Sequence, residues 1–486
     1  MGRKYALSGS CCGRIHRRRF LVDLGLGFTG LALGSMLQKD GVVRGADVAA
    51  PSSIKPKAKK IIWVFLSGGV SHLETFDPKP LLNKLAGKTY DETKLPNPMK
   101  SPLFKARSRT VTAIERTFYS TVYPLQVGHK KYGQMGMEVS DWLPNLATCV
   151  DDMAFVRSMY TTDNDHDAEF QMHHGRHKLD DKQPVIGSWI HYGLGTLNEN
   201  LPQFVVLGEF RDTRVKQIFD ADYLGPVHGG VHLSLDPKNP LPFGSPGKDV
   251  SVQEQQGQYA YINHLNRISA VEYPDDEQLR ARIQAYELAF RMQQSVPDVV
   301  DLSKETKETQ QLYGLDNPAT AIYGRRCLAA RRLAEKGVRF TLVYLSDYGE
   351  WDSHADLKNL HARSCGRVDK PLAGLIKDLK RRGMFEDTVV VCCTEFGRTP
   401  ASEKGTGRDH HPNGFTVWLA GAGIKRGIVH GATDELGFHA VENPHYVTDI
   451  HATLLHLLGM DSHRLEIPGR KRLEIDCGAP IREILA

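Results

Sequence analysis

Six short apolar runs constrain the fold of this chain more than any other feature of its sequence. They lie at residues 61–66, 153–156, 204–207, 339–345, 388–393 and 415–419. A run that is apolar on both faces suits a strand buried within a parallel sheet. Helical periodicity, with apolar residues at three- and four-residue steps, separates several of these runs. The helical stretches lie at 275–293, 321–336, 356–382 and 447–458. Strands that alternate with helices predict an α/β fold with a mostly parallel central sheet flanked by helices.

Residues 1–50 are typical of an export signal and a linker. Arg17 and Arg18 are followed by Phe20 and Leu21 and then by a short apolar run over 22–37. Twin arginines ahead of such a run indicate the route that exports folded proteins. The run is shorter than the roughly 20 residues that a membrane-crossing helix needs. We therefore expect a periplasmic or extracellular protein without a membrane span in its mature form; the alternative is a basic tail ahead of a buried helix.

The remaining chain, 51–486, is expected to form a single domain. The stretch 198–246 is rich in Gly, Pro and Asp, has no clear periodicity, and predicts an insertion beside the functional edge of the sheet. The eight cysteines are scattered without the spacing of a disulfide framework or a zinc finger, so we expect reduced thiols that serve packing. A net charge of +5, much of it in the signal segment, argues against a nucleic-acid partner.

Acidic residues and histidines follow the predicted strands, at the positions where ligands gather in open parallel sheets. The candidates are His72, Glu74, Asp77, Asp352, His354, Glu395, Asp409, His410 and His411. Carboxylates and imidazoles from several loops are the ligands that a hard or borderline divalent cation requires. The pattern predicts a site for divalent metal ions, with Zn, Mn and Ca as the candidates. The competing interpretation of a single residue of this kind is a turn former or helix cap, as for Asp77 before Pro78.

Four segments of the chain resemble an exported, sulfatase-like family known as domain of unknown function 1501. They are Gly68-Gly69 with 71–80, Trp351-Asp352-Ser353-His354, the Thr-Glu-Phe-Gly-Arg-Thr-Pro block at 394–400, and the Gly-Arg-Asp-His-His-Pro block at 407–412. The resemblance extends from about residue 60 almost to the C-terminus. That family is grouped with the alkaline-phosphatase-like superfamily, which includes sulfatases and metal-dependent phosphomutases. The resemblance implies a three-layer α/β sandwich with a site at the C-terminal edge of its sheet.

The resemblance also implies roles for individual residues. Glu395 matches the place where relatives have a metal-binding Asp followed by His, and His411 matches a late metal-binding His. Asp352 and His354 resemble an Asp…His pair that binds the first ion, although relatives usually space the pair by four residues rather than two. Relatives also place an acidic ligand directly after the first strand. This chain has Ser67-Gly68-Gly69 there, which leaves His72, Glu74 or Asp77 as substitutes.

The nucleophile is the largest departure from the superfamily pattern. Relatives begin a helix after the second strand with Ser, Thr or a modified Cys, whereas this chain has Asn164-Asp165-His166 there. Thr161 and Thr162 lie too early, and Cys327, which fits the loose Cys-x-Ala-x-Arg pattern of sulfatases, lies far too late and inside an amphipathic helix. We therefore expect direct attack by metal-activated water. His166 would act as ligand or general acid–base, Asn164 would help to place the ester, and Arg398 would hold the oxyanion.

Two hypotheses follow for the function. The first is an exported metal-dependent hydrolase that acts on phosphate or sulfate esters of a small molecule or a glycan. The second is a non-catalytic relative that keeps the fold and binds an anionic glycan or a partner protein.

Overall fold

The computed structural model describes residues 54–486 apart from 108, 110–118, 209–217, 237–238, 242–251, 273–287, 289–290, 293–294, 468 and 471. The predicted export signal and most of the helical stretch 275–293 lie outside the described residues. The other predicted helices and all six predicted strands lie within them.

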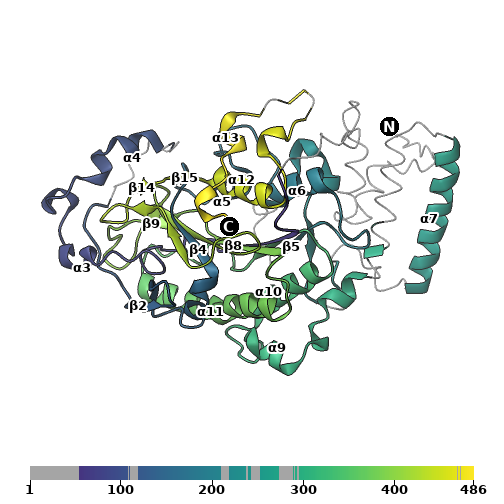
Figure 1. Cartoon of the computed structure of the whole chain (residues 1–486), viewed down its shortest axis with the longest axis horizontal. Helices are drawn as coiled ribbons and strands as arrows, with labels where there is room; N and C mark the ends of the chain where they lie inside the picture. Colours follow the sequence, from purple (N-terminus) through teal and green to yellow (C-terminus); the bar gives the residue numbers. More distant parts are fainter. Residues whose placement is uncertain are drawn as a thin grey trace, which may run out of the picture.

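A nine-stranded sheet forms the centre of the molecule (Figure 1). Its order is β12-β4-β11-β8-β1-β7-β5-β6, with β15 also paired to β4. The strands are β1 (Lys60–Phe65), β4 (Met153–Tyr160), β5 (Phe204–Leu207), β6 (Val231–Leu233), β7 (Phe340–Tyr344), β8 (Thr388–Cys393), β11 (Phe415–Gly421), β12 (Ile428–His430) and β15 (His445–Tyr446). Pairing is parallel throughout except where β11 lies antiparallel to β4 and β8. The prediction of a mostly parallel sheet built from the six apolar runs is confirmed.

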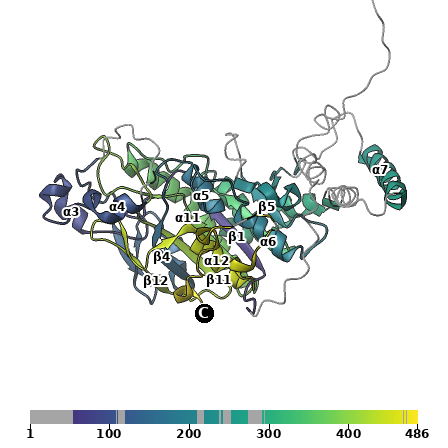
Figure 2. The ribbon, with the colours of Figure 1, turned by 90° about the horizontal axis from the view of Figure 1, so that it is seen from above.

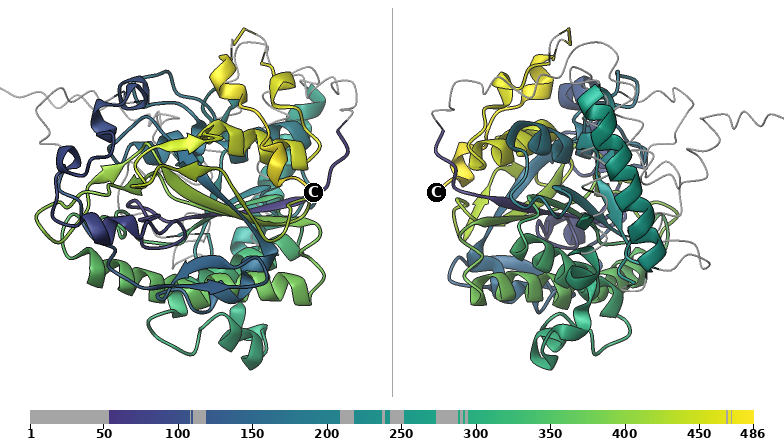
Figure 3. Two further views of the ribbon diagram at one scale, coloured as in Figure 1. Left: turned by 60° about the vertical axis from the view of Figure 1, so that its left-hand side comes forward. Right: turned by 90° about the vertical axis from the view of Figure 1, so that its right-hand side faces the viewer.

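Helices cover both faces of this sheet, and the alternation of side chains along β1 shows why. Ile62 and Val64 point into one core, together with residues of α10 and α11. Trp63 and Phe65 point into the other, together with residues of α5, α6 and α12. The helices are α5 (Ala168–His174), α6 (Ile186–Leu194), α10 (Ala321–Glu335), α11 (Leu357–Arg381) and α12 (Val447–Leu457). Figure 3 shows α12 and the α10–α11 pair on opposite sides of the strands, so the predicted three-layer architecture is confirmed.

Smaller elements surround the sandwich. Three two-stranded ribbons pair β2 (His129–Tyr132) with β3 (Met137–Ser140), β9 (Gly397–Arg398) with β10 (His410–His411), and β13 (Ala432–Thr433) with β14 (Ala440–Glu442). Further α-helices among the described residues are α3 (Leu81–Leu85), α4 (Pro102–Arg107), α7 (Val252–Glu272), α9 (Lys307–Leu312) and α13 (Glu474–Cys477). Figure 2 shows α3 and α4 at one end of the molecule and α7 at the other.

The stretch 198–246, predicted as an insertion, supplies β5 and β6 to the edge of the sheet. The cysteines among the described residues, from Cys149 to Cys477, are all buried and unpaired. In this part of the chain, no helix combines the length and the apolar character that a membrane crossing requires.

Candidate metal centre

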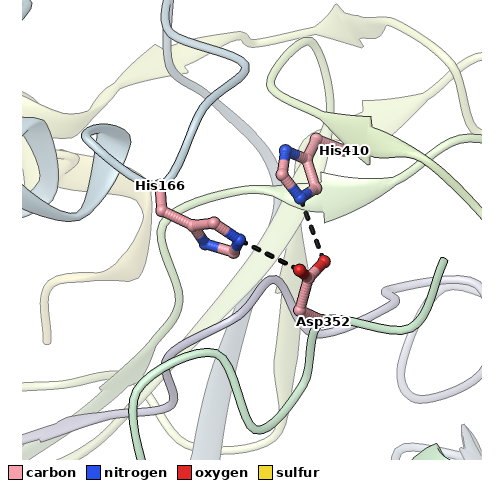
Figure 4. Close-up of side chains that lie close together, drawn as sticks. All are labelled: His166, Asp352 and His410. Atoms are coloured by element: carbon pink, nitrogen blue, oxygen red, sulfur yellow. Dashed lines mark hydrogen bonds and ion pairs between the residues drawn. The ribbon is translucent and has the colours of Figure 1, made fainter.

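Loops at the C-terminal edge of the sheet bring a compact group of polar side chains together (Figure 4). His166 follows β4, Asp352 and His354 follow β7, Glu395 follows β8, and His410 lies on β10. These loops are distant in sequence, but β4, β7 and β8 run in the same direction and therefore end at the same edge.

Asp352 lies at the centre of the group. Its Oδ2 is 3.2 Å from Nε2 of His166, and its Oδ1 is 3.0 Å from Nε2 of His410. The same Oδ1 is 2.9 Å from Nε2 of His354. Potential ligand atoms of His166, Asp352 and His410 lie within 4.8 Å of one another, and so do those of His354, Asp409 and His410. The described residues thus include two overlapping groups that could hold a metal ion, with His410 in both.

The Nδ1 atoms of His410 and His354, which face away from Asp352, each contact an oxygen atom of the protein. Nδ1 of His410 donates to the carbonyl oxygen of Asn164 at 2.8 Å, and Nδ1 of His354 contacts the carboxylate of Glu403. With Nδ1–H donated outward, a neutral ring presents the lone pair of Nε2 inward. The two Nε2 atoms are 3.1 Å apart. A histidine whose other ring nitrogen donates to a carbonyl or carboxylate is the usual arrangement of a metal ligand.

Glu395 ties the group to the loop after β1. One carboxylate oxygen accepts from the backbone N–H of Gly68 at 2.7 Å and lies 3.2 Å from Nδ1 of His166. The other accepts from the Thr394 hydroxyl at 3.0 Å. Gly68 has a φ of +115°, and a Cβ there would lie 2.6 Å from the backbone nitrogen of Asp352. The approach of these loops therefore requires glycine at this position.

Protons balance the charges of the group when no ion is bound. Burial opposes the ionisation of Asp352, but hydrogen bonds from the three histidines and the charge of Arg398 hold its pKa well below the usual range. Burial also opposes the charged form of His166, yet hydrogen bonds to Asp352 and Glu395 raise its pKa to about 10. A divalent cation competes with this proton, because ligating imidazoles must be neutral.

The structure places Arg398 inside the protein, which does not favour the predicted role of holding an oxyanion. The side chain is fully buried, and its guanidinium donates to Oδ1 of Asp352 at 2.7 Å. Its three nitrogens also donate to the backbone carbonyls of Gly68, Gly69, Trp351 and Arg408. Because every nitrogen is engaged inside the protein, Arg398 binds three loops together and orients Asp352.

Glu74 and Asp77, two of the predicted ligands, lie outside both groups because other side chains hold them. Glu74 is fully buried and pairs with Arg408, with its Oε1 2.8 Å from Nη2. Asp77 pairs with Lys79 at 3.1 Å and accepts a hydrogen bond from the Thr433 hydroxyl. Both carboxylates stabilise the fold around the site rather than completing the group.

His72 and His411 also lie outside both groups. Nε2 of His72 donates to the carbonyl of Gly437 at 2.8 Å, and Nε2 of His411 donates to that of Phe438. Burial lowers the pKa of both, that of His411 to about 3, so both are neutral. His410 and His411 are neighbours on β10, and successive side chains of a strand point in opposite directions. Of these two neighbours, His410 therefore contacts Asp352 and His411 does not.

Asn164 and Asp409 both form hydrogen bonds with His410. The main-chain oxygen of Asn164 accepts from the ring of His410, as described above. Oδ1 of Asp409 accepts from the backbone N–H of His410 at 2.8 Å and lies 3.8 Å from Nδ1 of His354. A cavity of about 40 Å³ adjoins all three, with Tyr119 also in its wall. Since one water needs roughly 10–15 Å³ of such space, the cavity has room for water.

Two acidic residues near the site were not anticipated from the sequence. Glu403 lies in the loop between β9 and β10, which does not directly follow a strand of the central sheet, so the pattern of predicted strands did not mark it. Glu169 lies on α5, and its Oε2 accepts from the hydroxyls of Ser67 at 3.0 Å and Tyr344 at 3.1 Å. Burial and the charge of Glu395 raise the pKa of Glu169 to about 8. The carboxyl group at the end of β1 thus comes from a helix, three residues after His166.

The family model described as "Protein of unknown function (DUF1501)" matches residues 58–485, and the chain belongs to that family. This confirms the part of the prediction from the four sequence segments that assigned the chain to domain of unknown function 1501. Among curated proteins, no sequence matches this chain.

Several solved structures match this chain with low sequence identity and low TM-scores. A phosphonate monoester hydrolase from Silicibacter pomeroyi has 12% identity and a TM-score of 0.36 over 71% of each chain. A lipoteichoic acid synthase, LtaP, from Listeria monocytogenes has 11% identity and a TM-score of 0.35 over 92% of this chain and 81% of that one. A protein in the alkaline phosphatase superfamily from Vibrio parahaemolyticus has 12% identity and a TM-score of 0.35 over 96% and 79%. Likeness at this level carries no argument about activity or substrate.

Proposed function

We propose that this protein is an exported metal-dependent hydrolase of phosphate or sulfate esters, with a small molecule or a glycan as the organic part. The observation that carries the proposal is the inward-facing Nε2 atoms of His354 and His410 beside the carboxylate of Asp352. A nitrogen lone pair repels a carboxylate oxygen at about 3 Å, so each of these contacts needs a proton or a metal ion between its two atoms, in addition to the Arg398 guanidinium that already binds Oδ1.

The donor set favours some metal ions over others. Imidazoles together with carboxylates suit Zn²⁺ or Mn²⁺, whereas Ca²⁺ prefers six to eight oxygen ligands. His166, Asp352 and His410 would hold one ion, and His354 and Asp409 would join His410 at the overlapping position. A divalent ion bound there supplies Lewis-acid polarisation of the ester and a lowered pKa for water.

The residues of this chain would orient and exchange protons. Glu403 fixes the ring of His354 and the Asn164 carbonyl fixes that of His410, so neither imidazole can turn away. His166 lies between Asp352 and Glu395, with its side chain 16% exposed, and is our candidate for ligand or general acid–base. Its placement allows a proton to be held at Nδ1 against Glu395 while Nε2 faces the centre.

Metal analysis and an ester panel test this function. Mature protein is analysed for Zn, Mn and Ca, then assayed on aryl and sugar phosphates and sulfates. We expect stoichiometric metal, turnover of at least one ester class, and loss of both metal and turnover in His410→Ala. His463→Ala is the matched control, because His463 is half exposed and distant in sequence from all site loops. Protein that contains no stoichiometric metal, and gains no thermal stability from added metal, would contradict the proposal.

One observation favours the alternative of a non-catalytic binding protein. Arg398, the arginine at the centre of the described site, is fully buried and donates to backbone carbonyls and to Asp352, so its guanidinium is not exposed to the oxyanion of an ester. Stoichiometric metal together with glycan binding, but without turnover of any ester in the panel, would decide for this alternative.

A further inference from the structure

The loop that carries Asn164 and His166 contains three aspartates at alternate positions, and a lysine from beyond α5 lies among them. Nζ of Lys178 is 3.3 Å from Oδ2 of Asp165, 3.3 Å from Oδ2 of Asp167 and 3.7 Å from Oδ2 of Asp163. Three carboxylates on five residues repel one another, so the loop needs a cation at this point. The chain supplies that cation itself.

The aspartates connect the ammonium to the backbone of His166. Oδ1 of Asp163 accepts from the N–H of Asp165 at 3.1 Å, and Oδ1 of Asp165 accepts from the N–H of His166 at 2.8 Å. The second oxygen of each carboxylate faces Lys178. Asp163 and Asp165 therefore each use one oxygen to fix the main chain and the other to face the ammonium, whereas Asp167 contributes its contact with Lys178 alone.

Asp163 distinguishes this cluster from an ordinary surface ion pair. Asp163 is only 1% exposed, and its Oδ2 has no hydrogen-bond partner among the described residues. That oxygen faces Nζ of Lys178 and, at 3.5 Å, Nε2 of the buried His177. Exposed pairs contribute little to stability, but a buried carboxylate without its cation is costly.

We propose that Lys178 is a positioning residue, which acts on the metal centre by fixing the 163–167 loop and with it the ring of His166. The loop lies between β4 and α5, and Lys178 lies just after α5, so the contact closes the loop around the start of that helix. The proposal rests on the proposed function in one respect, namely that His166 takes part in binding a metal ion.

Lys178→Met tests the proposal, because it removes the charge and keeps the length of the side chain. Lys182→Met is the matched control, since Lys182 is an exposed lysine four residues later. Hydrogen exchange of the 161–168 peptide and Zn²⁺ affinity of the metal-free protein are measured for each. We expect Lys178→Met to exchange faster in that peptide and to bind Zn²⁺ about 10–100-fold more weakly, the effect typical of losing a group that orients a ligand. Lys182→Met is expected to match the wild type, and Lys178→Arg to regain most of the affinity.

A double variant guards against simple unfolding. Asp163→Asn with Lys178→Met removes the buried charge together with its cation, so we expect it to fold and still to bind Zn²⁺ weakly. Wild-type affinity in the double variant or in a folded Lys178→Met would overturn the positioning role. If hydrogen exchange of the 161–168 peptide is the same in Lys178→Met as in the wild type, Lys178 does not fix the 163–167 loop. If the wild type binds no metal, the proposed function fails and with it the effect on His166, whereas the exchange measurement still decides whether Lys178 fixes the loop.

Discussion

Asp352 is contacted by three imidazoles and a guanidinium, and each contact comes from a different part of the chain. His166 comes from the β4 loop, His410 from β10 and Arg398 from β9, while His354 follows Asp352 by two residues. This set explains why its pKa is held low despite burial. The negative charge of Asp352 therefore holds the three imidazoles and the guanidinium together.

Replacing Asp352 by Asn is expected to abolish metal binding and ester turnover. The amide adds N–H donors opposite the Arg398 guanidinium and removes the negative charge that the imidazoles require. Metal content and turnover are measured beside Asp316→Asn, a control on a carboxylate with a half-exposed side chain. Retention of stoichiometric metal in Asp352→Asn would exclude Asp352 as a ligand.

Unlike Asp352→Asn, the substitution Glu74→Gln is expected to lower the stability of the fold while leaving the metal content unchanged. The change leaves the buried Arg408 guanidinium without its charged partner, which typically costs about 3–5 kcal/mol. Urea denaturation and metal analysis of the same preparation check both parts. Loss of metal at unchanged stability would instead return Glu74 to the set of ligands.

At the scale of elements, α5 brings a carboxyl group to the end of β1. Ser67 and Tyr344 bind one oxygen of Glu169, and Oε1 is buried without a hydrogen-bond partner in the described part of the chain. Its folded-state pKa of about 8 exceeds the ordinary 4.5, so folding favours the protonated form. The contribution of Glu169 to stability is therefore complete below about pH 4.5 and is lost as pH rises through about 8.

Glu169→Gln is expected to remove this pH dependence. The amide has the shape of the protonated acid but does not ionise, so the variant should lose less stability than the wild type between pH 5 and 9. Thermal denaturation is followed across this range with chelator present, so that metal binding does not contribute. Parallel pH profiles for the two proteins would contradict the raised pKa.

The sequence predicts elements better than it predicts which side chains meet. The apolar runs 204–207 and 388–393 coincide with β5 and β8. Strands that are covered on both faces are apolar along their whole length, so the limits of the apolar run mark the limits of the strand. The choice between His410 and His411 depends on the two-residue pairing of β10 with β9, which no periodicity reveals. Glu403 and Glu169 were missed because Glu403 does not directly follow a strand of the central sheet and Glu169 lies within a helix.

At the scale of the whole molecule, export would be expected to follow folding. The site is assembled from loops between residue 67 and residue 411, so it exists only in the folded chain. The twin-arginine route carries folded proteins, which suits a metal centre of this kind. The export signal lies outside the described residues and stays a prediction.

Changing Arg17 and Arg18 to Lys is expected to retain the full-length protein in the cytoplasm. The substitution keeps the positive charge of the segment and removes the guanidinium pair. Cell fractionation and immunoblotting follow the location, with Arg14→Lys as the control within the same basic region. Export of the double variant at the wild-type level would indicate another route.

The contacts of Arg398 have a consequence for sequence variation in this family. Its guanidinium binds the backbone carbonyls at positions 351 and 408 rather than their side chains, and every residue type offers such a carbonyl. Homologues are therefore free to drift at these two positions as far as this contact is concerned. Position 398 itself has no such freedom, because a lysine cannot reach all the acceptors that the planar fork reaches. An alignment of the family should therefore show an invariant arginine at position 398, and any conservation at positions 351 and 408 must come from their own side-chain contacts, such as the pairing of Arg408 with Glu74.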